Sequence, residues 1–293
     1  FINATRGEKL EKAISNMQPK DIILMQNTRY EDLDGKKESS CDMELAKYWA
    51  SLGDVFINDA FGTLHRSHAS NVGISTYLES GIGLLVEKEL TALNYLFDPD
   101  RPFIIILGGA KVSDKINLIA NLITKCDYLL IGGAMAFTFL KAEGYNVGTT
   151  KVDEEAISFC QEMLNKYKDK IILPVDALCN QTFEDTKGTV KDITEITNMA
   201  LDIGPNTINI YKQNLSKAKT VLWNGPIGVY EFANYANGTN EILTYLTTLD
   251  AKTILGGGDI VAAASNCHVT DKLYHISTGG GATLEFLEGK QLP

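Results

Sequence analysis

The stretch FIIILGGAKVSDK, residues 103–115, decides the fold class of this chain. Five consecutive apolar residues, Phe103–Leu107, are followed at once by two glycines and then by Lys111 and Lys115. A short continuous apolar run that ends in a small-residue turn is typical of a buried strand in a parallel sheet. We expect a helix to begin directly after the turn, with the two lysines, four residues apart, on one helical face.

The same order of apolar run, small-residue turn and helix-like stretch recurs through the rest of the chain. Apolar strands separated by helical stretches predict a parallel sheet that is covered by helices on both faces. The carboxyl ends of such strands share one edge, where ligands bind, so the glycine-containing turns should converge on one crevice. The expected strands are Phe103–Leu107, Tyr128–Ile131, Ile171–Leu173, Val221–Trp223, Thr253–Leu255 and Leu273–Ser277.

The first part of the chain has the same character with fewer strands. Ile22–Met25 and Val55–Ile57 are strand-like, and Glu8–Ile14 and Met43–Ser51 carry apolar residues at helical spacing. Two short strands are too few for an independent doubly wound sheet. We therefore expect this lobe to be incomplete, with further strands upstream.

Residues 84–97, LLVEKELTALNYLF, predict a helix that ends at Asp98-Pro99. Two interpretations stay open: a connector between two lobes, or an amphipathic helix of one lobe. A length of 293 residues favours two domains over one core. The predicted fold is α/β, with two Rossmann-like doubly wound parallel-sheet lobes joined by a helix and an incomplete N-lobe. Its predicted parts are residues 1–84, 85–99 and 100–293.

Composition narrows the function classes. A formal net charge of -10 argues against a general nucleic-acid binder. The sequence has no apolar run of 18 residues and its first residues do not resemble a secretory signal, so we expect no membrane span and no export. Five scattered cysteines without a C-x-x-C pair favour reduced cytosolic thiols over a zinc site or disulfides.

Two glycine-containing turns carry the strongest signal for chemistry. Lys111 and Lys115 would add two ammonium groups to a helix N-terminus, which suits a polyphosphate; the alternative is a solvated lysine pair. After another strand come Gly257, Gly258 and Asp259, where glycine admits a phosphate and a carboxylate can hold Mg²⁺. The alternative for Asp259 is a helix cap. The common P-loop and dinucleotide fingerprints are absent.

Arg29 and Arg66 follow the strand-like segments of the first part. Arginine pairs well with a carboxylate or a phosphate, and an acid that accepts a phosphoryl group presents both. From spacing alone, the favoured interpretation is that these arginines are surface residues and that His68 only packs.

Six segments resemble signature segments of phosphoglycerate kinases. They occur in the family's order and with about the family's spacing. The resemblance extends from about Phe1 to Pro293 and is far more specific than any one glycine turn. The segments are NDAFGTLHRSHASNVG (58–73), LGGAKVSDKI (107–116), IGGAMAFTFLKA (131–142), WNGPIGVYE (223–231), LGGGD (255–259) and STGGGATLEFLEGK (277–290).

The resemblance implies reversible phosphoryl transfer between 1,3-bisphosphoglycerate with ADP and 3-phosphoglycerate with ATP, in glycolysis. It implies a hinge-bending enzyme whose N-lobe binds the phosphoglycerate and whose C-lobe binds the nucleotide with Mg²⁺. Catalysis would then be mostly positioning and charge neutralisation. The implied protein is a cytoplasmic monomer without nucleic-acid or membrane partners.

Carried over residue by residue, the resemblance also implies roles in both lobes. Arg29, His65 and Arg66 would hold the acid substrate, and Arg29 would be catalytic as well. Lys111 would neutralise the phosphoryl group in flight, and Asp259 would ligate Mg²⁺. The implied nucleotide-binding residues are Ala110, Lys111, Lys115 at a phosphate, Gly132, Gly133, Leu201, Gly204, Asn224, Pro226, Glu231 at the ribose, Gly257, Gly258, Asp259 and Ile260.

The sequence departs from the family pattern in several places. The family's opening segment, which supplies half of the acid site, and its final segment have no counterpart here. Ile260 stands where the family usually has Ser or Thr, and Gln26 where it has Glu. We therefore expect this chain to bind nucleotide without turnover. A non-catalytic nucleotide-binding fragment and another nucleotide-dependent kinase of a small acid stay open as alternatives.

Overall fold

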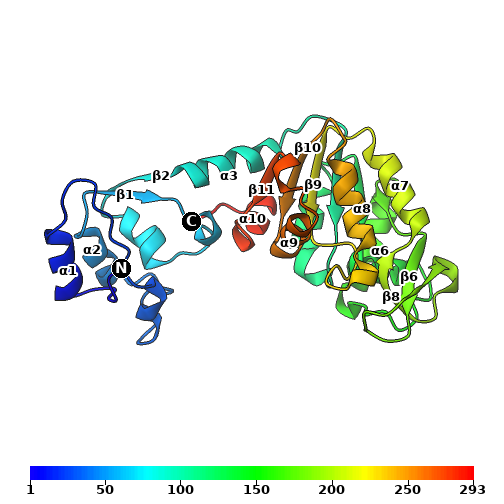
Figure 1. Cartoon of the computed structure of the whole chain (residues 1–293), viewed down its shortest axis with the longest axis horizontal. Helices are drawn as coiled ribbons and strands as arrows, with labels where there is room; N and C mark the ends of the chain where they lie inside the picture. The colour runs from blue at the N-terminus through cyan, green and yellow to red at the C-terminus, as the bar shows by residue number, and fades with distance from the viewer. The chain divides into compact units, whose positions relative to one another are not determined.

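The structure is a computed structural model that describes residues 1–293, and the chain divides into two compact units (Figure 1). Unit 1 comprises Phe1–Leu90 together with Gln291–Pro293, and unit 2 comprises Thr91–Lys290. The division lies inside helix α3 (Leu84–Tyr95), the helix that the sequence predicted between the two parts. The predicted parts placed this helix between the units, whereas its two halves belong to different units.

A six-stranded parallel sheet forms the centre of unit 2, in the order β11–β10–β9–β3–β4–β5. All six strands expected from the sequence are present, which confirms the Rossmann-like α/β prediction for this part. From β3 the chain builds outward to β4 and β5 on one side, and later to β9, β10 and β11 on the other. The bounds are β3 (Phe103–Leu107), β4 (Tyr128–Ile131), β5 (Ile171–Ile172), β9 (Thr220–Asn224), β10 (Lys252–Gly256) and β11 (His275–Ser277).

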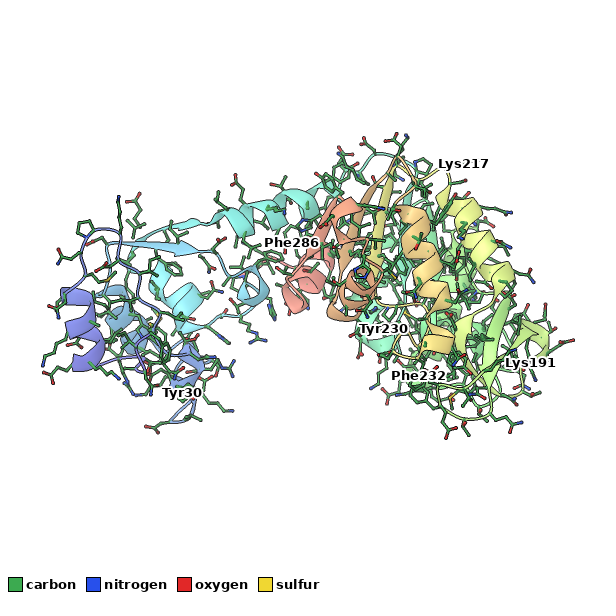
Figure 2. The ribbon with its side chains drawn as sticks, in the orientation of Figure 1. Tyr30, Lys191, Lys217, Tyr230, Phe232 and Phe286 are labelled. Carbon is green, nitrogen blue, oxygen red and sulfur yellow. The ribbon has the colours of Figure 1, made fainter.

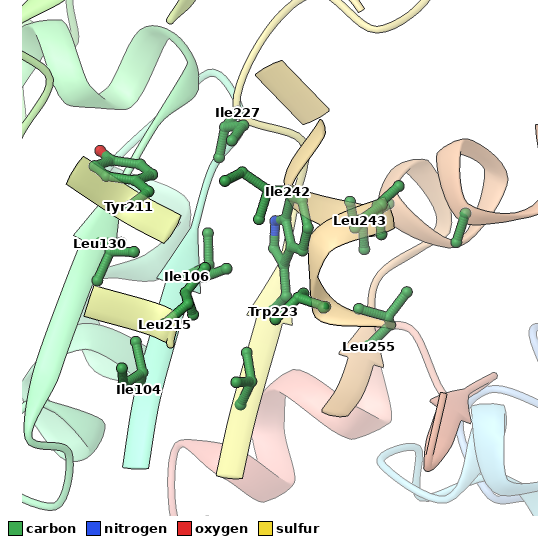
Figure 3. Packing of buried hydrophobic residues seen from close by; sticks show 14 of the residues in the cluster. Ile104, Ile106, Leu130, Tyr211, Leu215, Trp223, Ile227, Ile242, Leu243 and Leu255 are labelled. Atoms are coloured by element: carbon green, nitrogen blue, oxygen red, sulfur yellow. The ribbon is translucent and has the colours of Figure 1, made fainter. Parts of the chain in front are cut away.

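The sheet is buried because helices cover it and supply apolar side chains. All five residues of β3 are 0% exposed, as expected for a central parallel strand. The Trp223 side chain of β9 lies among Ile106, Ile242 and Leu255 in the main core cluster (Figure 3). The helices of unit 2 are α4 (Ile116–Leu122), α5 (Gly133–Ala142), α6 (Ile157–Tyr167), α7 (Pro205–Leu215), α8 (Asn237–Leu246), α9 (Gly258–Asn266) and α10 (Gly281–Leu287).

A second, three-stranded antiparallel sheet in unit 2 was not predicted. It comprises β6 (Asp176–Asn180), β7 (Thr189–Asp192) and β8 (Met199–Ile203), in the order β7–β6–β8. Its strands lack the continuous apolar runs of the parallel sheet, and β7 is largely exposed. The hydrophobic pattern therefore gave little signal for it.

Besides the first half of α3, unit 1 contains two α-helices and one small sheet. The helices α1 (Glu8–Ser15) and α2 (Met43–Ala50) agree with the sequence, and β1 (Val55–Asn58) pairs in parallel with β2 (Glu79–Ile82). The strand predicted over Ile22–Met25 is wrong: only Met25 forms a bridge, to Ile2. Ile22 is 93% exposed, and without a ladder of backbone partners its apolar character does not make a strand.

The first helical turn of the decisive stretch also differs from the prediction. A 3₁₀ turn, Ser113–Lys115, precedes α4, which begins only at Ile116. Lys111 lies before that turn and Lys115 at its end, so the two lysines do not share one face of an α-helix. None of the helices in the two units is sufficiently long and apolar to span a lipid bilayer.

Candidate active site

The carboxyl ends of β3 and β9 lie next to each other, at the point where the sheet reverses its strand order. Ligands bind at such a point in open α/β sheets. Here the Gly108 amide donates to the Asn224 carbonyl at 2.9 Å, and the Gly109 amide donates to the Pro226 carbonyl at 2.9 Å. A Cβ atom on Gly108 would lie 2.0 Å from the Pro226 oxygen, so this close approach of two loops requires glycine.

A cavity of about 410 Å³ opens beside these loops. Ligand pockets of this size are common. The lining of this cavity is dominated by small and apolar residues, which suit a flat aromatic ring such as a nucleobase. From β8 and its surroundings come Leu201 and Asp202, and from the loop after β9 come Gly228 and Val229. Six residues that the sequence analysis named line this cavity: Ala110, Gly133, Leu201, Pro226, Glu231 and Asp259.

A second hollow, of about 470 Å³, continues from the first. The two share Gly109, Ala110, Pro226 and Asp259. The second hollow is rich in charge and in glycine, which suits phosphate groups rather than a base. Its other lining residues include Lys111, Asp114, Lys115, Asn224, Gly225, Gly257, Gly258, Gly280 and Gly281.

The two lysines of the second hollow are in different environments. Lys111 is exposed on the loop after β3, whereas Lys115 is partly buried. The Lys115 ammonium donates to the carbonyls of Gly108, at 2.6 Å, and of Asn224, at 3.2 Å. Burial lowers the pKa of Lys115 to about 8, against the opposing charges of Asp114 and Asp259. Lys115 therefore joins the ends of β3 and β9 while it lines the hollow.

Asp259 lies in the first turn of α9 and lines both hollows. The N-cap position of this helix is Gly257, with φ of 107°, so Asp259 is not the capping residue. No cluster of three or more His, Cys, Asp or Glu side chains suited to a metal ion is present in residues 1–293. A single exposed carboxylate fits Mg²⁺, which keeps waters and takes its remaining oxygens from phosphates.

Ile260, which the sequence analysis placed at the nucleotide, does not line either hollow with its side chain. Ile260 is 0% exposed and belongs to the main core cluster, because this position in the first turn of α9 faces the sheet. Only its backbone is near the strand end. A side-chain hydroxyl at this position would point into the core. Its absence therefore removes no phosphate contact from the hollow.

Two predicted glycines lie outside the residues that line the hollows. Gly204 is the N-cap of α7, and a Cβ there would lie 2.3 Å from the Asp176 carboxyl carbon. A Cβ atom on Gly132 would lie 2.4 Å from the Ile227 Cβ. Both glycines serve close packing here. Asn224 does line the second hollow, and its Nδ2 donates to the Gly256 carbonyl at 2.6 Å.

The residues predicted to hold the acid substrate lie in unit 1. Arg29, in the 3₁₀ turn Thr28–Asp32, pairs with Asp32 at 2.7 Å, and the Arg66 Nε donates to the His65 Nε2 at 3.4 Å. Burial lowers the pKa of His68, and the charges of Arg29 and Arg66 add to this effect against the charge of Glu38. The two arginines, 37 positions apart in sequence, are thus gathered around one histidine.

Several cavity residues gave no signal in the sequence. Phe183 lies in a polar loop and is 59% exposed, yet its ring centroid is 4.9 Å from that of Phe232, which Figure 2 labels. Asp202 is buried on β8, and burial raises its pKa to about 8. Its carboxylate accepts from the Gly238 amide at 2.7 Å and from the Ile203 amide at 2.9 Å. No motif surrounds either residue, so only the folded chain reveals them.

Comparison with known proteins adds a family to this geometry. A family model described as "PGK: Phosphoglycerate kinase" matches residues 1–290. Proteins named phosphoglycerate kinase from Staphylococcus epidermidis and Staphylococcus aureus are each 54% identical to this chain over 298 residues. Each alignment covers 100% of this chain and 75% of the relative.

Solved structures agree with the sequence comparison. The phosphoglycerate kinase from Coxiella burnetii superposes with a TM-score of 0.86 at 40% identity, over 92% of this chain and 71% of the other. That from Pyrococcus horikoshii OT3 superposes with a TM-score of 0.87 at 29% identity, over 100% of this chain and 76% of the other.

Proposed function

This chain belongs to the phosphoglycerate kinase family, and we propose that its unit 2 holds the nucleotide while its unit 1 holds the acid substrate. The family match over residues 1–290 supports this function over the alternative of another nucleotide-dependent kinase of a small acid. The function is phosphoryl transfer between 1,3-bisphosphoglycerate with ADP and 3-phosphoglycerate with ATP. One observation supports the nucleotide assignment above all: two adjoining hollows, one apolar and one charged, share residues at the reversal point of the parallel sheet.

The base would occupy the apolar cavity and the phosphates the charged hollow. Gly133, Leu201 and Pro226 supply flat apolar contacts in the first, and Glu231 lies where a ribose hydroxyl could donate to its carboxylate. In the second, Lys115, held by the two carbonyls it binds, would attract a phosphate. Lys111, on the exposed side, would neutralise the transferred phosphoryl group, whose charge is spread over its outer oxygens.

Mg²⁺ would be held by Asp259 and by nucleotide oxygens. When bound, it would neutralise phosphate charge and fix the phosphate geometry. Asp114 also lines the charged hollow, and it provides a matched test of this assignment. Asp259→Asn should raise the Mg²⁺ concentration needed for half-maximal activity, since a charged oxygen ligand becomes neutral. Asp114→Asn should leave that concentration near its original value; equal effects of the two variants would reject Asp259 as the ligand.

The acid substrate would bind at the arginines of unit 1. Arg29, His65 and Arg66 present cationic and hydrogen-bonding groups around one small region of that unit. Arginine forks match a carboxylate or a phosphate, and both groups occur on 3-phosphoglycerate. Arg66→Ala should raise the KM for 3-phosphoglycerate while the KM for MgATP stays unchanged. A rise in the KM for MgATP alone would contradict this division of labour.

The direct test of the function is a kinase assay with MgATP and 3-phosphoglycerate, together with calorimetry of MgADP binding. We expect MgADP to bind to this chain without measurable turnover, and ADP formation that depends on 3-phosphoglycerate is expected in a full-length context. The activity comparisons of the Asp259 and Arg66 variants also require that full-length context. Nucleotide hydrolysis that does not respond to the acid would reject the proposed substrate. A monomeric state and a cytoplasmic location stay predictions, as does the absence of nucleic-acid and membrane partners.

A further inference from the structure

The Asp153 side chain does not cap its own helical turn and instead accepts a hydrogen bond from a residue distant in sequence. It occupies the N-cap position of the 3₁₀ turn Glu154–Ala156, which leads into α6, but it makes no side-chain cap there. Its carboxylate accepts instead from the Ser113 amide, 40 residues earlier, at 2.8 Å. An N-cap aspartate normally satisfies the free amides of its own helix. Here it satisfies the first amide of a turn in another part of unit 2.

The turn that Asp153 holds carries Lys115, and Lys111 lies just before it in the loop. Ser113 is the first residue of the turn Ser113–Lys115, with Lys111 two residues before it. Val112 beside it is fully buried, whereas Lys111 and Ser113 are exposed on the loop. A fixed Ser113 amide therefore restrains the backbone between the two ammonium groups.

Asp153 is itself held by helix α5, next to the apolar cavity that Phe137 of the same helix lines. Its amide donates to the buried Thr138 hydroxyl, on α5, at 3.1 Å. We call residues 148–153 the strap. Within it, the Thr150 hydroxyl accepts from the Ala200 amide on β8 at 3.0 Å, and both Thr150 and Lys151 line the apolar cavity. The strap thus connects the base-binding wall with the turn that carries Lys115.

Electrostatics alone would argue against an aspartate here. The hydrogen bond from Ser113 lowers the pKa of Asp153, and Lys111 adds to this, while burial opposes it. The group is therefore ionised at neutral pH, and its negative charge weakens the field that Lys111 offers to an anion. A carboxylate near a phosphate site is more readily explained by its hydrogen bond than by its charge.

We propose that Asp153 is a positioning residue for phosphoryl transfer: through Ser113 it holds the turn that presents Lys111 and Lys115 to the nucleotide phosphates. This inference rests on the proposed nucleotide site. The strap would then have a role in catalysis besides lining the apolar cavity, because it fixes the position of the turn beside the charged hollow. Asp153 need not touch the nucleotide.

The test compares MgADP with adenosine, which lacks the phosphates, by calorimetry on the full chain. Asp153→Ala removes the acceptor and should weaken MgADP binding about tenfold, while adenosine affinity changes less than twofold. Asp153→Asn keeps an acceptor oxygen and removes only the charge, so its MgADP affinity should equal or exceed that of the original protein. Asp192→Ala is the matched control, because Asp192 caps the Thr194 amide of its own turn at 2.9 Å; both affinities should stay unchanged.

Three outcomes would overturn the proposal. If Asp153→Ala leaves MgADP affinity unchanged or tightens it, as a lost counter-charge would, Asp153 does not position the turn. If Asp153→Asn weakens MgADP binding as much as Asp153→Ala, the charge matters and not the bond. If Asp153→Ala does not fold, Asp153→Glu keeps charge and capping chemistry but displaces the oxygens, and unchanged MgADP affinity in that variant would reject the proposal.

Amide exchange separates this inference from the proposed function. Exchange of the Ser113 amide should accelerate in Asp153→Ala and not in Asp153→Asn, whether or not nucleotide is present. Failure of the original chain to bind MgADP would reject the nucleotide site. Unaltered Ser113 exchange in Asp153→Ala would instead reject the positioning bond.

Discussion

Both units contain a parallel sheet with an apolar strand, β3 in unit 2 and β1 in unit 1, but these two strands differ in burial. In unit 2, every residue of β3 is fully buried between β4 and β9. In unit 1, β1 has β2 as its only partner, and Val55 and Ile57 are 58% and 56% exposed. An apolar strand sequence therefore does not determine burial. Burial comes from neighbours on both sides and helices on both faces.

The candidate sites of the two units also differ in how deeply their supporting backbone is buried. The nucleotide residues of unit 2 are set by backbone hydrogen bonds between buried strand ends, such as that from Gly109 to Pro226. The acid-binding candidates Arg29 and Arg66 are exposed and carried by short turns. We expect substitutions in unit 2 to affect both stability and chemistry, and those in unit 1 to affect mainly binding.

The largest expected effect comes from a matched pair of strand substitutions. Ile106→Ala, in β3, should lower the free energy of unfolding of unit 2 by about 2–5 kcal/mol, because it leaves a cavity in a packed core. Ile57→Ala, in β1, should change the free energy of unfolding of unit 1 by less than about 0.5 kcal/mol. Urea unfolding followed through Trp223 in a Trp49→Phe background measures unit 2, and unfolding followed through Trp49 in a Trp223→Phe background measures unit 1. Equal losses would mean that the contrast in exposure carries no energetic weight.

In a full-length context, Lys111→Ala should have the next largest effect, on rate rather than on stability. Removal of one preorganised charge at a developing transition-state charge costs on the order of 10²–10³ in kcat. Nucleotide affinity should change far less, since the contact matters most in the transition state. Lys217→Ala, at an exposed lysine of unit 2 that Figure 2 labels, is the control and should be silent. A Lys111→Ala enzyme with near-normal kcat would remove Lys111 from the chemistry.

Sequence reasoning located unit 2 well and unit 1 poorly, for physical reasons. Continuous apolar runs such as Phe103–Leu107 predicted the six parallel strands, since strands buried on both faces need them. The turn glycines predicted the crevice. The same logic failed at Ile22–Met25, where no partner strand completes a ladder, and at β7, whose polar residues give no period. Phe183 and Asp153 act through contacts with distant segments, which no local pattern encodes.

Ile260 provides the third test, because sequence and structure disagree about it. The sequence suggested that Ile260→Thr would restore a phosphate contact and tighten MgATP binding. Since Ile260 is fully buried, the substitution should instead lower the free energy of unfolding of unit 2 by about 1–3 kcal/mol, with MgATP affinity unchanged. Val261→Thr, at a partly buried neighbour, should cost less. Tighter MgATP binding by Ile260→Thr would restore the sequence interpretation.

Lys115 should make nucleotide binding sensitive to alkaline pH, whereas the arginines of unit 1 remain charged. The pKa of Lys115 in the free protein is about 8, so the cation is present below that pH and is lost above it. MgADP affinity should fall up to about tenfold per pH unit above pH 8, a slope that one proton produces. Lys115→Arg should abolish this slope. A pH-independent affinity in the original protein would mean that Lys115 does not act through its charge.

The smallest expected effect is the pH dependence of stability that Asp202 causes. The sign of the pH dependence is opposite in the two units. Burial raises its pKa from 3.8 to about 8, so between these values the folded state binds a proton that the unfolded state does not. Unit 2 should therefore lose stability as pH rises, by about 1 kcal/mol per pH unit between pH 5 and 7. The lowered pKa of His68 in unit 1 gives the opposite sign, with stability gained as pH rises.

The readout for Asp202 is the slope against pH, not the stability at one pH. Urea unfolding followed through Trp223 in the Trp49→Phe background reports unit 2 and leaves His68 out. Exposed carboxylates with lowered pKa values, such as Asp185 and Asp192, titrate below 3.8 and do not interfere above pH 5. Asp202→Asn cannot ionise, so it should flatten the slope even if a weaker bond to the Gly238 amide costs a constant amount. An equal slope in Asp202→Asn would show that another group binds the proton. The burial of the Asp202 carboxyl group beside the apolar cavity would then have no measurable effect on the pH dependence of unit 2.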